Sequence, residues 1–124
     1  MIQGLIIGHG AIGEGLESAI RTITGTCDGI TYISNIGLST ADIAEEVRSF
    51  TREHDCSDGV IIFIDLFGGS CWQGAKLANT PDTHIVTGVN LPMLLSFMNK
   101  RSIHAFDDLP GILDTDGKRG IQAG

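Results

Sequence analysis

Short apolar runs alternate with amphipathic stretches along the chain. The segment Leu5 to Ile7 is apolar and is closed by a glycine, a pattern typical of a buried strand. Between Glu14 and Ile23, apolar residues recur at helical spacing and predict a helix. Gly29 to Ser34 is rich in β-branched and aromatic residues and predicts a second strand. The chain is therefore expected to begin as strand, helix, strand.

The same alternation continues through the middle of the chain. A helix capped by Ser39 or Thr40 is predicted to run to about His54. Gly59 to Ile64 is a continuous apolar run, as expected of a strand buried on both faces of a parallel sheet. Ser70 is expected to cap the helix that follows this strand.

Toward the C-terminus the predicted strand and helix are shorter. His84 to Thr87 predicts a fourth strand and Leu91 to Met98 a further helix, whereas Pro110-Gly111 is expected to interrupt any long helix after it. Repeated strand–helix units with right-handed crossovers predict an α/β fold: a doubly wound, mainly parallel sheet flanked by helices. With 124 residues and no linker or internal repeat, residues 1–124 are predicted to form a single domain.

Composition excludes several classes of function. A net charge of −7, with no cluster of Lys or Arg, argues against binding nucleic acid. No run of about 18 apolar residues is present, so no membrane span is expected. Three widely spaced cysteines and the lack of a signal peptide favour reduced thiols and a cytoplasmic location.

The strongest candidate for chemistry is His9. It lies in the glycine-rich turn Gly8 to Gly13, between the first predicted strand and the first predicted helix. A helix N-terminus offers free N–H groups and a partial positive charge, so such a turn is suited to receive an anion. A nucleophilic side chain at this place predicts that the anion becomes attached to it.

A second loop is expected to meet the first. Asp65 follows the third predicted strand, and if the first and third strands are neighbours it faces His9 at the point where the strand order of the sheet reverses. A carboxylate that accepts a hydrogen bond from one ring nitrogen leaves the other nitrogen free to attack. Gly68 and Gly69 let the backbone approach a bound group, and Ser70 adds a hydroxyl.

The predicted catalytic residues are therefore His9 and Asp65. The anion is taken to be a phosphoryl group, and the residues predicted to bind its oxygens are Gly10, Gly68, Gly69 and Ser70. No cofactor is expected. No metal is expected either, because no second ligand stands beside His9 in the sequence at a useful spacing.

Simpler interpretations remain open. A lone histidine after a strand is often structural, an aspartate there is often a turn former, and Ser70 could be only a helix cap. The turn Gly8 to Gly13 also matches the dinucleotide fingerprint G-x-G-x-x-G. That fingerprint needs an acidic residue after the second strand, where this chain has Asn35 and Ile36. The match is therefore a weak one.

The chain resembles the IIA domain of the mannose family of the bacterial phosphoenolpyruvate-dependent sugar phosphotransferase system. The matching segments are Ile6 to Gly10, Asp65 to Ser70, Thr87 to Leu94 and, less closely, Gly117 to Ile121. The chain departs from the family at Gly8, where Ser or Thr is usual, and at Cys71, where Pro is usual.

The resemblance implies a protein-histidine phosphotransferase active in sugar transport. His9 would take a phosphoryl group from phosphorylated HPr and pass it to a IIB protein, with Asp65 orienting the ring and Ser70 holding the phosphate. The family forms a homodimer in which an antiparallel C-terminal edge strand, here Arg119 to Ala123, pairs with the partner's sheet. Any contact with the membrane would be indirect, through a transporter complex. The alternative is a regulatory module, in which phosphorylated His9 controls a partner protein without sugar transport.

Overall fold

The computed structural model describes all 124 residues as a regular alternation of strands and helices. The strands are β1 (Gln3–Gly8), β2 (Ile30–Ser34), β3 (Val60–Ile64) and β4 (Thr83–Thr87). The helices are α1 (Ile12–Thr24), α2 (Thr40–Glu53), α3 (Ser70–Ala78), α4 (Leu91–Lys100) and α5 (Leu109–Arg119), with a short 3₁₀ helix, η1 (Phe106–Asp108), before α5. Each strand and helix that the apolar pattern predicts is present, and each end that was predicted lies within two residues of the observed one.

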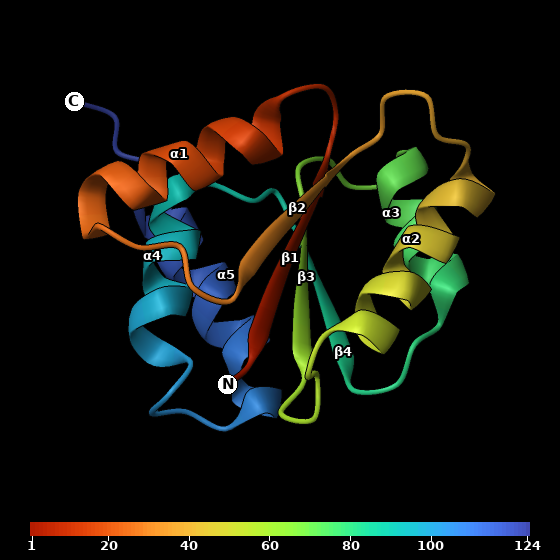
Figure 1. The fold of residues 1–124 in the computed structure, drawn as a ribbon. Helices are drawn as coiled ribbons and strands as arrows, with labels where there is room; N and C mark the ends of the chain where they lie inside the picture. The colour runs from red at the N-terminus through yellow and green to blue at the C-terminus, as the bar shows by residue number, and fades with distance from the viewer.

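The four strands form one sheet in the order β2-β1-β3-β4, and every neighbouring pair is parallel. Helices α1, α4 and α5 cover one face of this sheet and α2 and α3 cover the other (Figure 1). The chain leaves β1 toward β2 on one side and returns to β3 on the other. This confirms the predicted α/β fold, and the strand order reverses between β1 and β3, where ligands of such sheets bind.

Side chains of the two central strands contribute to two hydrophobic clusters, one on each face of the sheet. Ile6 and Phe63 point to the face covered by α1, α4 and α5, where the ring of Phe97 meets that of Phe63 edge-on at 5.2 Å. Leu5 and Ile62 point to the opposite face, against α2 and α3. Because both faces of β1 and β3 are buried, the ends of these strands are held rigidly.

Two details of the helices differ from the sequence prediction. Pro110 does not interrupt a helix but lies in the first turn of α5, where its missing N–H would have had no helical partner. Ser70 is not a cap but the first residue of α3, and Gly69 is the N-cap. None of the helices is long and apolar enough to cross a membrane.

The predicted antiparallel edge strand is absent from this single chain. Helix α5 continues beyond Gly117 and includes Arg119, the first residue of the predicted strand. Ile121 to Gly124 belong to no helix or strand. All four strands of the sheet are parallel.

Candidate functional site

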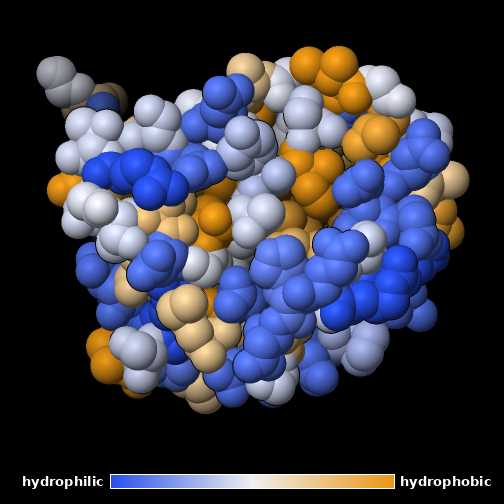
Figure 2. Space-filling model, in the orientation of Figure 1, coloured by the Kyte–Doolittle hydropathy of each residue, from blue (hydrophilic) through white to orange (hydrophobic).

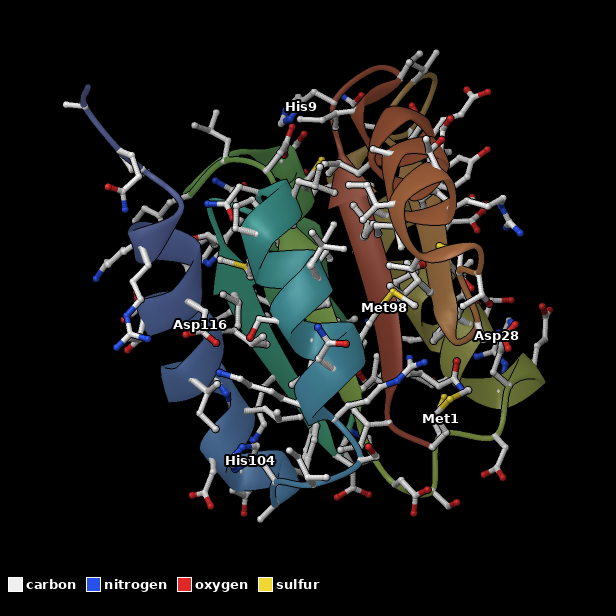
Figure 3. The ribbon with its side chains drawn as sticks, turned by 90° about the vertical axis from the view of Figure 1, so that its left-hand side faces the viewer. Met1, His9, Asp28, Met98, His104 and Asp116 are labelled. Atoms are coloured by element: carbon white, nitrogen blue, oxygen red, sulfur yellow. The ribbon has the colours of Figure 1, made fainter.

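His9 stands directly beyond the end of β1, at the edge of the sheet where the strands end (Figure 3). The turn that holds it passes through Gly10, whose φ of +60° is a left-handed conformation that favours glycine. The backbone N–H of Gly10 donates to Asn35 Oδ1 at 3.1 Å, and Ser34 Oγ donates to the Gly10 carbonyl at 2.9 Å. The loop after β2 thus fixes the turn from the side.

Asp65 holds His9 from the end of the neighbouring strand β3. Its Oδ2 accepts the backbone N–H of His9 at 2.9 Å, and its Oδ1 and Oδ2 lie 3.1 and 3.0 Å from the ring Nδ1. The Asp65 side chain is 12% exposed and that of His9 is 41% exposed. The pair predicted from the sequence is therefore in contact, with the ring facing solvent.

The charge of Asp65 determines the form of the His9 ring. Burial alone would raise the pKa of the Asp65 carboxyl, but the hydrogen bonds from the His9 backbone and ring outweigh it and leave this pKa below its ordinary value. A carboxylate only accepts hydrogen bonds, so the proton between the two groups belongs to Nδ1. The Nε2 of a neutral ring then carries the lone pair.

The loop between β3 and α3 lies beside this free nitrogen. Gly68 is left-handed, with a φ of +85°, and directs the chain to Gly69. A Cβ built on Gly69 would lie 3.6 Å from His9 Cε1 and 3.8 Å from Nε2. Ser70 then opens α3, whose first N–H groups lack helical partners. On this side the space next to Nε2 is therefore bordered by the backbone of Gly69 rather than by a side chain.

The predicted site residues differ in how they meet His9. Asp65 contacts it and Gly69 approaches it, whereas the N–H of Gly10 is already donated to Asn35. Asn35 was not predicted as a site residue. Its position directly after the second strand is the only signal in the sequence that could have suggested it.

Cys71 was also not predicted to be near the histidine. Its side chain is fully buried in the first turn of α3, and its Sγ lies 4.0 Å from His9 Nδ1. Burial raises the pKa of this thiol, and the nearby Asp65 carboxylate raises it further. Ligand atoms of His9, Asp65 and Cys71 all lie within 4.8 Å of one another.

The surroundings of the site are open and partly apolar. Leu66 and Phe67, from the loop after β3, are 59% and 71% exposed, and Ile36, from the loop after β2, is 72% exposed. Figure 2 shows hydrophobic side chains gathered at the upper edge of the molecule, over the ends of the strands. The larger surface pocket, about 370 Å³, lies elsewhere, between α3 and β4.

Comparison with known proteins shows the family to which the chain belongs. The family model for the PTS system fructose IIA component, EIIA-man, matches residues 4–112. The chain belongs to the EIIA-man family. The resemblance inferred from the sequence is therefore confirmed at the level of the family.

Individual relatives are distant in sequence but similar in fold. The mannose-specific EIIAB component of the PTS from Escherichia coli (strain K12) is 26% identical over 128 residues, which cover 99% of this chain but only 40% of that protein. The fructose-specific EIIA component from Bacillus subtilis (strain 168) is 26% identical and is covered over 86% of its length. A crystal structure of the phosphotransferase system component EIIA from Streptococcus agalactiae superposes with a TM-score of 0.88 at 24% identity, covering 99% of this chain and 97% of that one.

Proposed function

We propose that this protein is a phosphocarrier of a sugar phosphotransferase system. His9 Nε2 accepts a phosphoryl group from phosphorylated HPr and passes it to a IIB protein. One observation carries the proposal: Asp65 holds the Nδ1–H of His9, so the lone pair lies on the exposed Nε2. Membership of the EIIA-man family supports the same role.

The chemistry needs no cofactor. The Nε2 lone pair forms a bond to phosphorus while the bond between phosphorus and the HPr histidine breaks. The attached phosphoryl group leaves the ring with a positive charge, which the Asp65 carboxylate stabilises through Nδ1–H. In the second transfer the same bond to Nε2 breaks, and the group moves to the IIB protein. The activity is therefore that of a protein-histidine phosphotransferase.

The phosphoryl oxygens are held by backbone groups of the loop before α3. Gly69 presents no side chain at Nε2, Gly68 shapes the loop that leads to it, and the first N–H groups of α3, with the hydroxyl of Ser70, can donate to the oxygens. Gly10 serves mainly to shape the turn, because its N–H would have to leave Asn35 to reach a phosphate. Neither the Gly8–Gly13 turn nor the Asp65–Ser70 loop contains Lys or Arg, which suits a group that must leave again.

Proteins fit this site better than a free small molecule. His9 lies on an open surface rather than in the 370 Å³ pocket, and the exposed apolar residues Leu66, Phe67 and Ile36 come from loops at the same edge of the sheet. Exposed apolar patches mark protein interaction surfaces. We propose that HPr and the IIB protein dock here in turn, that residues 1–124 act as one domain, and that any contact with the membrane is made through the transporter.

The decisive test is intact mass spectrometry after incubation with phosphoenolpyruvate, Enzyme I and HPr. We expect one acid-labile phosphate on the wild type and none on His9→Ala. His104→Ala is the matched control, because this exposed histidine lies far from the site, and it should be phosphorylated like the wild type (Figure 3). Asp65→Asn should slow the transfer by about 10²-fold, the order of effect of a positioned catalytic partner.

The outcomes separate the alternatives. Phosphate on the His9→Ala variant would refute the assigned nucleophile. A wild type that takes up phosphate but passes it to no IIB protein, and instead binds a partner only when phosphorylated, would replace transport by the regulatory function. No phosphate on a folded wild type, with the upstream proteins active on another IIA, would refute the phosphocarrier role.

A further inference from the structure

Three side chains that can each offer a metal ligand converge at His9 Nδ1, the ring nitrogen opposite the proposed nucleophile Nε2. His9 follows β1, Asp65 follows β3 and Cys71 lies in the first turn of α3, so each is held by a different element. Their ligand atoms lie within 4.8 Å of one another, with Nδ1 at 3.0 Å from Asp65 Oδ2 and 4.0 Å from Cys71 Sγ. From this cluster we infer that the protein binds one zinc-like divalent cation through His9 Nδ1, the Asp65 carboxylate and Cys71 Sγ.

The distances suit a tetrahedral ion. Bond lengths of about 2.0–2.1 Å to nitrogen and oxygen and 2.3 Å to sulfur place ligand atoms roughly 3.3–3.6 Å apart. The separation of Nδ1 and Sγ therefore needs to shrink by about half an ångström, and since no two ligand atoms are more than 4.8 Å apart, no pair needs to close by more than roughly 1.2 Å. These three side chains fill three positions of a tetrahedral ion and leave the fourth to a water molecule.

The charges and the types of ligand also favour such an ion. The Asp65 carboxylate and the Cys71 thiolate together neutralise a divalent cation, and no Lys or Arg is present in either loop to compete with it. A set of one imidazole nitrogen, one carboxylate oxygen and one thiolate sulfur suits zinc better than magnesium or calcium, which prefer oxygen ligands.

Binding the cation changes where the His9 proton lies. In the free protein Nδ1 carries the proton and donates a hydrogen bond to the Asp65 carboxylate. The cation takes the Nδ1 lone pair, so the ring proton moves to Nε2, and the thiol of Cys71 releases its proton to solvent. One proton is therefore released for each cation bound, and the bonds to nitrogen, oxygen and sulfur replace the hydrogen bond between His9 and Asp65.

This exchange makes metal binding and phosphorylation mutually exclusive. With a proton on Nε2, the ring has no lone pair with which to attack phosphorus. The metal site itself does not depend on the proposed function, whereas this inhibition of phosphoryl transfer rests on it.

Cobalt(II) is the probe for the site, because a thiolate bound to it gives a charge-transfer band in the near ultraviolet. We expect a titration of the reduced protein with Co²⁺ to give this band at one equivalent, and Zn²⁺ to remove it by displacement. Cys71→Ala should lose the band. Cys56→Ala is the matched control and should keep it, because Cys56 lies in the loop before β3.

A third variant distinguishes the loss of a metal ligand from the loss of the folded structure. His9 is half-exposed, so His9→Ala leaves the core intact, and it should weaken Co²⁺ binding by at least about tenfold through the loss of one ligand. Absence of the band in the wild type would overturn the inference. A band that persists in Cys71→Ala but disappears in Cys56→Ala would overturn it as well, by placing the cation near the other cysteine.

The effect on transfer is measured separately. Stoichiometric Zn²⁺ should abolish phosphate uptake by the wild type, a chelator should restore it, and whatever uptake Cys71→Ala shows should not respond to Zn²⁺. Phosphate uptake by a zinc-loaded wild type would overturn the mutual exclusion while leaving the phosphocarrier role in place. A cobalt band on a protein that never takes up phosphate would support the metal site and refute the proposed function.

Discussion

At the scale of single residues, the site depends on which nitrogen of His9 is free. Asp65 accepts both the backbone N–H and the ring Nδ1–H, so it sets the position of the turn and the tautomer of the ring together. Gly69 leaves Nε2 uncovered. Loss of the Asp65 carboxylate and addition of a side chain at position 69 should therefore reduce transfer for different reasons.

The first prediction concerns Gly69→Ala. The added methyl group would lie 3.8 Å from Nε2, in the space that the phosphoryl group enters in the proposed mechanism. We expect phosphate uptake to slow by roughly 10²-fold, the order of effect of misplacing a reacting group by about an ångström. The backbone of Gly69, with φ −81°, accepts alanine, so the free energy of unfolding should change by less than about 1 kcal/mol.

Gly15→Ala is the matched control for this substitution. Gly15 lies in α1, and a Cβ there would meet no atom within 4 Å. This variant should take up phosphate like the wild type and gain roughly 0.5–1 kcal/mol in stability. Rates measured by rapid quench and stabilities from urea unfolding test both variants. An unchanged rate for Gly69→Ala would show that phosphate does not occupy this space.

The sequence predicts the contact of His9 with Asp65 but not the neighbours that complete it. Both residues end apolar strands, and a doubly wound sheet brings such ends together. Asn35 contacts the His9 turn from the loop after β2, and Cys71 lies near the His9 ring from the first turn of α3. Neither feature has a periodic pattern in the sequence, so tertiary packing alone brings these residues to His9.

At the scale of elements, the strands and the first four helices follow from their apolar patterns, but α5 does not. Pro110 and Gly111 weaken its helical pattern, although a proline is well placed in a first turn. What holds α5 is packing: Leu109 and Leu113 are fully buried against the same core as α4. Tertiary contacts of this kind override local propensity.

A polar contact adds to the packing of α5 on α4. Asp116 of α5 accepts hydrogen bonds from Lys100, at 2.6 Å, and from Ser96, both on α4. These hydrogen bonds, that from Lys100 first, lower the pKa of the Asp116 carboxyl below its ordinary value. The Asp116 side chain is 15% exposed, so the contact is largely shielded from solvent.

The second prediction is the pH dependence of this contact. Because the folded-state pKa is lowered, the folded protein binds fewer protons here than the unfolded chain does. The contribution of Asp116 to stability is therefore fully present above the unfolded pKa of about 3.9 and is lost as the pH falls through the folded pKa. Asp116→Asn should be less stable than the wild type at pH 7, and the difference should shrink below about pH 4.

Urea unfolding at a series of pH values measures this difference. Asp114→Asn is the control, because Asp114 lies on the same helix and its ion pair with Lys118 is exposed on both sides. This variant should differ little from the wild type at any pH, as is usual for surface pairs. A difference between Asp116→Asn and wild type that stays constant from pH 7 to about pH 3 would contradict the assigned linkage.

At the scale of the whole molecule, strand order positions the site. The order β2-β1-β3-β4 makes β1 and β3 neighbours, so the loops with His9 and Asp65 share one edge of the sheet. The alternation of strands and helices predicts a doubly wound parallel sheet, but that β1 and β3 are neighbours in it is shown only by the structure. The same order leaves the outer sides of both edge strands, β2 and β4, without a partner strand.

The third prediction is that the protein is a homodimer. An unpaired edge strand can pair with a strand of another chain. Ile121, which is 77% exposed, begins a segment that forms no helix or strand in the single chain. We expect sedimentation equilibrium to give twice the chain mass of 13.1 kDa. Deleting Ile121 to Gly124 should give the monomer mass, because the predicted interchain strand runs through Arg119 to Ala123.

The deletion variant also tests how the site depends on the dimer. His9, Asp65 and the loop before α3 all come from one chain, so a folded monomer should still take up one phosphate from HPr. A monomeric wild type would refute the homodimer. A variant that stays dimeric would place the interface elsewhere, and a monomer that folds but takes up no phosphate would show that the second chain helps to bind the phosphate donor.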